Sequence, residues 1–146
     1  MFPKIAITTD LLAGFVGETI DEFNECLSFI KKIGFSGMHI FPYSRRKNTV
    51  ADNMEGHLDP VIKNERAHIL QSVASIMKDE YESMFIGDTF DIITEQVKNG
   101  YYVGHTSNYL EVYVKNRTNL TDNMIIKVKI EKIENGKLIG KEIINE

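Results

Sequence analysis

Two glycines and an acidic residue, Gly14, Gly17 and Glu18, follow a short apolar run and precede a helix-like pattern. Glycine lets the backbone approach a ligand closely, and the first turn of a helix offers free N–H groups, so this segment is a candidate nucleotide-contacting loop. The alternative is a plain tight turn, in which Glu18 favours the positive end of the helix dipole. These residues alone leave both interpretations open.

A second segment combines aromatic, hydroxyl and cationic side chains. Three consecutive cations, Arg45, Arg46 and Lys47, follow Tyr43 and Ser44. This combination is suited to gripping a phosphate or stacking on a base, although a solvated basic loop has the same composition. Both segments directly follow strand-like runs, and neighbouring parallel strands end at one rim of a sheet. We therefore expect the two segments to lie together.

The elements that would position these segments are a strand, a helix and a second strand. The apolar runs 5–12 and 38–41 predict buried strands. Between them Thr19, followed three residues later by Glu22, is a capping-box signature for a helix over 19–33. The connection is long enough for a parallel pair, which predicts one βαβ unit. Such a unit is normally covered on both faces, so we expect the chain to begin within a larger fold.

A second helix is predicted to begin at Asp59 and Pro60, which supply an N-cap and a proline at the first helical position. It should reach about Tyr81. Four apolar residues are expected along its buried face: Ile62, Ile69, Val73 and Ile76.

Five short runs rich in β-branched and aromatic residues follow, separated by Asn and Gly turns. The runs cover residues 90–93, 101–103, 109–114, 124–133 and 138–144. They predict a small antiparallel five-stranded β-barrel. The expected fold class is α/β plus all-β, with a domain over 1–82 and a barrel domain over 83–146.

Composition limits what this chain does. The net charge is −4 and neither half, divided at Met84, is basic overall, so nucleic-acid binding would have to depend on local cations. The hydrophobic fraction of 42% is that of an ordinary soluble protein. No apolar run approaches the ~20 residues that span a bilayer, so we expect no membrane association and a cytoplasmic location.

Metal-ligating residues are sparse. Cys26 is the single cysteine and lies within the first predicted helix, so we interpret it as a core residue. One thiolate cannot hold an iron–sulfur cluster, which normally takes three or four. His39, His57 and His68 show no metal-ligand spacing with one another, and we assign no metal site.

Three segments together resemble the radical-SAM methylthiotransferase family, in particular the branch that modifies threonylcarbamoyladenosine in tRNA. Residues 7–19 are similar to the family's stretch ending in G-F-P-G-E-T, at the fifth strand of its partial barrel. Residues 41–49 resemble its F-x-Y-S-x-R-x-G-T stretch, and residues 104–112 its G-H-T-x-N-Y-L-x-V segment. The resemblance implies the C-terminal βαβ portion of a partial (β/α) barrel, a linking helix and a TRAM RNA-binding β-barrel.

Three positions depart from the family pattern. Val16 stands where the family usually has proline, Asn48 where it has glycine, and Val50 where proline often follows the threonine. Asn tolerates the left-handed conformation that glycine favours, so we expect Asn48 to keep its turn.

The resemblance implies an enzyme that uses S-adenosylmethionine and 4Fe-4S clusters to add sulfur and a methyl group at C2 of the modified adenosine. It implies that seven residues line the cofactor site: Gly14, Phe15, Gly17, Glu18, Phe41, Tyr43 and Ser44. The family's cluster domain and cysteine loop have no counterpart in this sequence. We therefore expect no catalytic residue, no cluster and no activity in this chain alone.

The resemblance also implies tRNA as a partner, through six residues: Arg45, Arg46, Lys47, His105, Asn108 and Tyr109. Arg46 favours a tRNA substrate, because the protein-modifying branch of the family has an acid at that position. His105, Asn108 and Tyr109 lie near a turn where they could stack on exposed bases and hydrogen-bond to them, or else serve barrel packing and turn geometry.

Alternative functions remain open at the level of sequence. The chain could work alone as a noncatalytic RNA-binding module, or belong to the isopentenyladenosine-tRNA or ribosomal-protein-modifying branch of the same family. A free-standing α/β nucleotide binder is disfavoured, because two parallel strands would leave a sheet edge exposed. Association of chains through exposed barrel strands is a further alternative.

Overall fold

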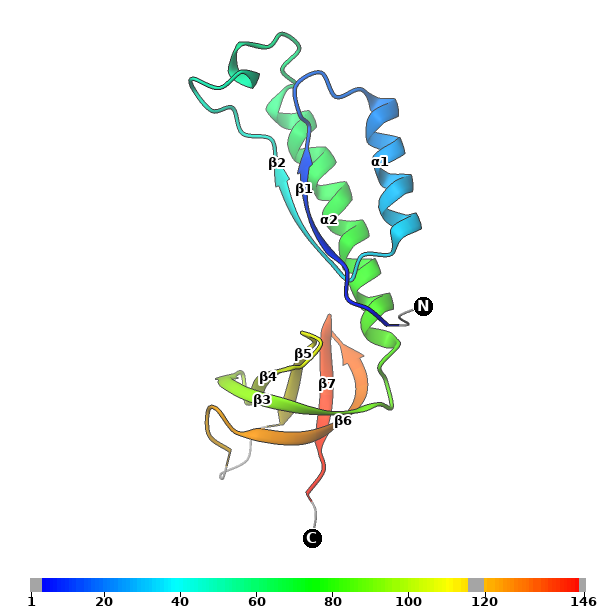
Figure 1. Cartoon of the computed structure of the whole chain (residues 1–146), viewed down its shortest axis with the longest axis vertical. Coiled ribbons are helices and arrows are strands. Elements are labelled where there is room, and N and C mark those ends of the chain that lie inside the picture. Colours follow the sequence, from blue (N-terminus) through cyan, green and yellow to red (C-terminus); the bar gives the residue numbers. More distant parts are fainter. Residues whose placement is uncertain (1–3, 116–119, 145–146) are drawn as a thin grey trace. The chain divides into compact units, whose positions relative to one another are not determined.

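The computed structural model describes residues 4–115 and 120–144. The chain divides into two compact units, drawn in Figure 1. The first unit runs from Ile7 to Lys78, and the second contains the chain from Asp79 onward together with the residues before Ile7. Among the described residues, neither helix is long and apolar enough to cross a bilayer.

The first unit is built on two parallel strands, β1 (Thr8–Ala13) and β2 (Gly37–Pro42), joined by the helix α1 (Ile20–Ile33). The strands pair in register from Thr8 opposite Gly37 to Ala13 opposite Pro42. This arrangement confirms the expected βαβ unit. A short 3-10 helix, η1 (Ala51–Asn53), and the long helix α2 (Pro60–Ser83) follow.

The capping box of α1 has formed as its sequence predicts. The Thr19 hydroxyl accepts a hydrogen bond from the Glu22 N–H at 3.2 Å, and the Glu22 carboxylate accepts one from the Thr19 N–H at 2.8 Å. The bond that the carboxylate accepts from the Thr19 N–H, with a second from the Thr19 hydroxyl, holds the pKa of Glu22 below its usual value. Gly34, with φ of 73°, ends the helix in the left-handed conformation, as is common at this position.

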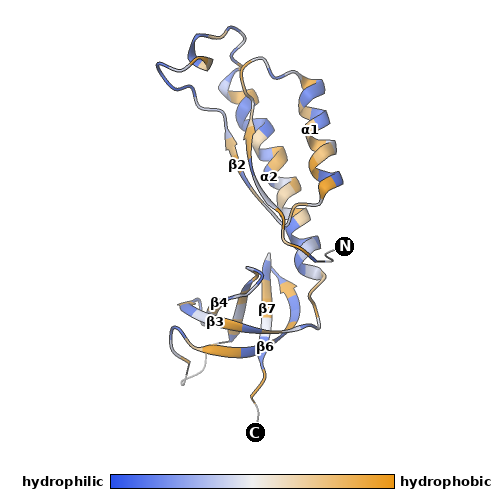
Figure 2. Cartoon of the chain, viewed as in Figure 1, coloured by the Kyte–Doolittle hydropathy of each residue, from blue (hydrophilic) through white to orange (hydrophobic). Residues whose placement is uncertain are grey.

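Both helices carry hydrophobic and hydrophilic residues in turn (Figure 2), and their apolar sides share one core. The fully buried members of this core come from β1, α1 and α2: Ala13, Phe23, Ile30, Ala67 and Leu70. Alternate strand residues face the other way, so the second face of the sheet is open. Its exposed residues form two cross-strand pairs, Asp10 with His39 and Leu12 with Phe41.

The buried face of α2 differs from the one predicted. Of the four apolar residues expected there, Val73 packs against the core, whereas Ile62, Ile69 and Ile76 are exposed. The helix instead buries Ala67 and Leu70, with the side chain of Arg66 beside them. The prediction was wrong because Arg66 counts as polar in a hydropathy pattern, although a long side chain can bury its stem when its charge is paired.

The second unit is a closed barrel of five strands. The strands are β3 (Thr89–Lys98), β4 (Tyr101–Thr106), β5 (Glu111–Lys115), β6 (Ile125–Glu134) and β7 (Lys137–Glu142). They are paired in the order β3-β4-β5-β7-β6, with β6 returning to β3. The expected fold class, α/β plus a five-stranded barrel, is thereby confirmed. One pair, β5 with β7, is parallel, because strands that alternate in direction around a ring of odd number must leave one parallel pair.

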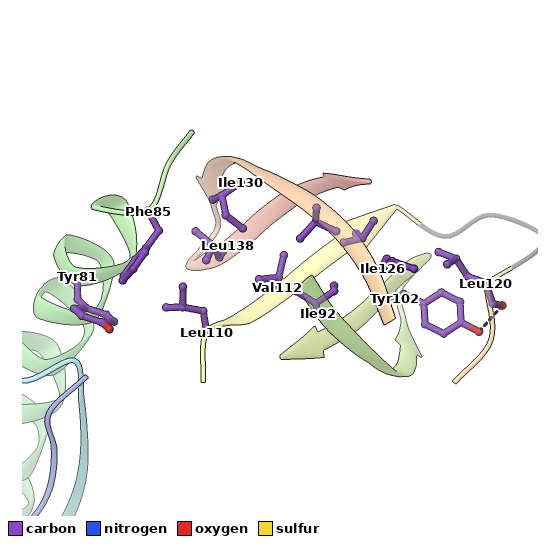
Figure 3. Close-up of a cluster of buried hydrophobic side chains, with 12 residues drawn as sticks. Tyr81, Phe85, Ile92, Tyr102, Leu110, Val112, Leu120, Ile126, Ile130 and Leu138 are labelled. Carbon is purple, nitrogen blue, oxygen red and sulfur yellow. Dashed lines mark hydrogen bonds between the residues drawn. The ribbon is translucent and has the colours of Figure 1, made fainter. Parts of the chain in front are cut away.

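Apolar side chains from all five strands' inner faces and their connections fill the barrel, as Figure 3 shows. Ile92, Val112, Val128 and Ile130 have no accessible surface. Tyr81 and Phe85 pack at one end of this core, with ring centroids 5.1 Å apart. At the other end the Tyr102 hydroxyl donates a hydrogen bond to the Leu120 carbonyl oxygen at 2.9 Å.

Candidate functional site

The two loops that follow β1 and β2 lie side by side, as expected from their common rim. The Tyr43 N–H donates a hydrogen bond to the Ala13 carbonyl oxygen at 2.7 Å. The Gly17 N–H donates to the Gly56 carbonyl oxygen at 3.0 Å, which brings a third segment to the same place. Gly14 and Gly17 have φ values of 72° and 78°, so both turns need the left-handed conformation that glycine adopts freely.

An aromatic cluster joins these loops. The Phe15 and Tyr43 rings meet edge to face with centroids 5.1 Å apart, and the His57 ring stacks on Tyr43 at 6.1 Å. The Lys63 ammonium lies 5.5 Å from the centre of the Tyr43 ring. The Tyr43 hydroxyl is buried and has no hydrogen-bond partner among the described residues. Because buried polar groups normally have partners, this oxygen indicates a place where a ligand would bind.

Glu18 holds its own loop together. Its carboxylate accepts a hydrogen bond from the Gly14 N–H at 3.1 Å and forms an ion pair with Arg66. Arg66 also donates to the Glu18 carbonyl oxygen at 3.0 Å, and its guanidinium lies 5.2 Å from the centre of the Phe23 ring. Glu18 is therefore a positioning residue for the loop. Sequence reasoning missed Arg66, since no local pattern connects it to a loop so far away in the chain.

The three consecutive cations have different surroundings. Arg45 is held by Asp52, through an ion pair and a hydrogen bond to the Asp52 carbonyl oxygen at 2.7 Å. The Asp52 carboxylate also accepts from the Asn48 N–H at 3.3 Å. Arg45 is thus part of the loop's framework, whereas the structure records no ion pair for Arg46 or Lys47 within its described ranges.

Asn48 has the left-handed conformation expected of it, with φ of 68°. The pKa of Asp52 is held below its usual value, chiefly by the hydrogen bond from Arg45. Val16, which replaces the family's proline, is buried at 7% exposure and is anchored by packing. Phe41 is exposed on the open face of the sheet, next to Leu12.

In the barrel, the three residues predicted to contact RNA lie at the end of β4 and in the turn after it. His105 Nδ1 lies 2.8 Å from Glu95 Oε1. Asn108 Oδ1 accepts a hydrogen bond from the Thr106 hydroxyl at 2.6 Å, so this amide helps to form the turn. Tyr109 is 87% exposed and has φ of 64°, a conformation that few non-glycine residues adopt.

His105 and Tyr109 line a surface pocket of about 500 Å³. Other residues that line it are Asp91, Ile93, Glu95 and Ile125. Sequence reasoning missed these four, because alternation along a strand predicts that their side chains face outward and not that they share a pocket with the turn. Asn108 does not line it.

The described residues do not fit a metal cluster. Nowhere in the described ranges do three His, Cys, Asp or Glu side chains gather as metal ligands. Cys26, on α1, is partly buried against the core. Burial raises the pKa of its thiol, which disfavours the thiolate that binds iron.

Comparison with known proteins adds a second line of evidence. No family model matches the chain. Threonylcarbamoyladenosine tRNA methylthiotransferase MtaB of Bacillus subtilis is 39% identical over 135 residues, which are 89% of this chain and 30% of that protein. Ribosomal protein uS12 methylthiotransferase RimO of Clostridioides difficile is 31% identical over 144 residues, which are 94% of this chain and 32% of the relative. The proteins to which this chain is similar are therefore methylthiotransferases.

A further similar protein, the tRNA-2-methylthio-N(6)-dimethylallyladenosine synthase of Endomicrobium trichonymphae, is 30% identical over 138 residues, 94% of this chain and 33% of that protein. The chain spans about a third of the length of these methylthiotransferases. The resemblance to methylthiotransferases thus covers most of the chain. These relatives are named for two tRNA modifications and for one ribosomal protein, so the similarity does not single out one branch of the methylthiotransferases.

Proposed function

We propose that this chain is the part of a tRNA methylthiotransferase that lines the S-adenosylmethionine site and docks the RNA, and that its substrate is threonylcarbamoyladenosine. The observation that carries the proposal is the meeting of two motif loops around the unpartnered Tyr43 hydroxyl. The relative with 39% identity is named for that substrate, which supports the choice of branch.

The loop residues fit S-adenosylmethionine. The left-handed turns at Gly14 and Gly17 leave backbone close to the site, Phe15 offers an apolar surface, and the Tyr43 hydroxyl could bond to a polar group of the ligand. When bound, S-adenosylmethionine supplies the transferred methyl group. Glu18 and Arg66 keep the loop in the conformation that receives it. Because the described residues do not fit an iron–sulfur cluster, we expect no turnover by this chain alone.

Charge supports RNA as the second ligand of this region. Arg46 and Lys47 follow the rim of the sheet, and a guanidinium and an ammonium together suit successive phosphates. Arg45 contributes by fixing the loop to Asp52.

A noncatalytic RNA-binding module is the second candidate. The specific observation in its favour is that the barrel closes on itself and has its own buried core.

Binding measurements on the chain test the proposal. A 17-nucleotide anticodon stem-loop with threonylcarbamoyladenosine should bind with micromolar affinity that falls steeply with salt, and more tightly than the unmodified or isopentenyl form. Replacing Arg46 and Lys47 by alanine should weaken binding, whereas the matched variant Lys31→Ala, Lys32→Ala at the end of α1 should not. Absence of binding at low salt would refute both candidates.

Equilibrium dialysis with labelled S-adenosylmethionine separates the two candidates. The proposal predicts saturable binding that Tyr43→Phe weakens, because that variant removes only the unpartnered hydroxyl. RNA binding without any such cofactor binding would leave the noncatalytic module as the function. Iron–sulfur reconstitution should give no cluster absorbance.

A further inference from the structure

We propose that the barrel pocket beside Tyr109 binds one unpaired nucleobase that carries an exocyclic amino group, while Lys127 and Lys129 hold the neighbouring phosphates. The inference deepens the proposed RNA binding and rests on it. It assigns the recognition of this base to Glu95, a residue that lies outside the three sequence motifs.

The floor of the pocket is apolar. Ile93 on β3 and Ile125 on β6 are directly opposite each other, and they are 49% and 71% exposed. Two exposed isoleucines side by side on a strand surface form a flat patch that water solvates poorly. The face of a nucleobase is also flat and poorly solvated, so it would pack against this patch.

Tyr109 supplies a second flat surface. Its φ of 64° costs about 1–2 kcal/mol for a residue with a Cβ, and its ring is almost fully exposed. Neither burial nor turn geometry explains a tyrosine here, because the turn bonds are made by Thr106: its carbonyl accepts from the Tyr109 N–H at 3.0 Å and its hydroxyl from the Leu110 N–H. Base stacking on an aromatic ring contributes about 1–3 kcal/mol to binding, so a stacking function would explain why a tyrosine is kept at this strained position.

Carboxylates at the pocket determine which base fits. Glu95 and Asp91 line it, and its lining includes His105 but no lysine or arginine. Glu95 Oε1 lies 2.8 Å from His105 Nδ1, so Oε2 is the oxygen left to accept from a base. Ionised carboxylates only accept hydrogen bonds, so the pocket would repel phosphate and attract donors. Cytosine, adenine and guanine have an exocyclic amino donor, and a Glu or Asp that accepts from cytosine is a known pairing. Uracil has only its ring N3–H, which lies between two carbonyl oxygens that a carboxylate repels.

The position of Glu95 comes from a β-bulge. The pairing of β3 with β4 passes from Thr94 opposite Gly104 to Gln96 opposite Val103, so Glu95 is the extra residue. Bulges redirect side chains and often lie next to functional sites. Thr94 fixes the bulge from inside the barrel, because its hydroxyl donates to the Thr121 carbonyl oxygen at 2.7 Å.

Cations lie beside this acidic pocket. Lys127 is opposite Asp91 in the strand pairing, and Lys129 follows on the same face of β6. Both are exposed, and no ion pair is recorded for either one within the part of the chain that the structure describes. The carboxylates in the pocket would accept hydrogen bonds from a base, and the two lysines outside it would bind the phosphates of its backbone. A basic peptide would also suit the carboxylates, but these two lysines would repel it.

Fluorescence anisotropy with eight-nucleotide RNAs at low salt tests the inference. The full chain should bind oligo-C and oligo-A at least fivefold more tightly than oligo-U, and Glu95→Gln should remove most of that difference. Tyr109→Gly should weaken binding of oligo-C about tenfold without lowering the melting temperature, since glycine relieves the backbone strain. Tyr109→Phe should retain the affinity.

A lysine pair provides the matched control for charge. Lys127→Ala with Lys129→Ala should weaken all oligonucleotides and reduce the salt dependence, whereas Lys98→Ala with Lys132→Ala, which removes equal charge elsewhere on the barrel, should have little effect. Binding of the stem-loop that is unchanged in Tyr109→Gly and Glu95→Gln would overturn the pocket and leave the proposed function intact. No binding of any RNA would refute both, and capture of a lysine-rich peptide instead of RNA would overturn the base assignment.

Discussion

At the scale of single residues, Asp52 holds the loop that contains Arg45, Arg46 and Lys47. Its carboxylate holds Arg45 and the Asn48 N–H, and these contacts lower its pKa from the usual 3.8. A carboxyl group whose folded pKa is depressed stabilises the loop above its unfolded pKa, and this contribution is lost as the pH falls through the folded value. We predict that the contacts of Asp52 with Arg45 and Asn48 persist near neutral pH, and that they are lost and the loop opens below about pH 4.

Amide exchange of Asn48 and the side-chain signals of Arg45, followed by NMR as the pH falls, measure this opening. Asp52→Asn should open the loop already at pH 7, and Asp122→Asn, an equal change of charge in the barrel, should not. A loop that remains closed in Asp52→Asn would show that Asp52 does not hold it.

Individual residues also show how far the sequence predicts the site. The left-handed turn at Asn48 and the meeting of the two loops follow from local rules and from parallel pairing, and both are present. The ion pair of Arg66 with Glu18 was not predictable, because it depends on how α2 packs against the first loop. Glu95 was missed for a similar reason, since a bulge appears only when two strands are paired.

At the scale of elements, Gly104 allows β4 to pass close to β3. A Cβ at this position would overlap the Ile93 carbonyl oxygen, and its φ is not in the glycine region, so close approach alone requires glycine. We predict that Gly104→Ala destabilises the barrel by about 1–3 kcal/mol, the range for overpacking. Urea unfolding followed by barrel tyrosine fluorescence measures the change.

Gly37→Ala is the matched control, because a Cβ on β2 would meet only the Thr8 methyl at 3.6 Å. This variant should change stability little. Equal losses of stability in the two variants would mean that the close approach of β3 and β4 is not the reason why position 104 requires glycine.

Element prediction succeeded where a pattern is local and failed where burial depends on tertiary contacts. The capping box at Thr19 and the five strand runs fall where the sequence places them, within a few residues. Tyr109 was expected in a strand but lies in the turn before β5. The buried face of α2 was predicted from three isoleucines and Val73, yet all three isoleucines are exposed.

At the scale of the whole molecule, two cores support two units. Leu70 is 1% exposed in the first core and Ile130 is fully buried in the barrel. Leu70→Ala and Ile130→Ala should each cost about 2–5 kcal/mol. Hydrogen exchange should show faster exchange in β1, α1 and β2 for Leu70→Ala, and in the barrel strands for Ile130→Ala. Uniform acceleration along the chain in either variant would show a single cooperative unit.

The most direct test of the account is a chemical-shift map of the isotope-labelled chain, recorded as the anticodon stem-loop with threonylcarbamoyladenosine is added. We predict that the largest changes occur at Glu95, His105 and Tyr109, along β6 at Lys127, and in the loop with Arg46. Changes confined to β5 and β7, or no changes at saturating RNA and low salt, would contradict it.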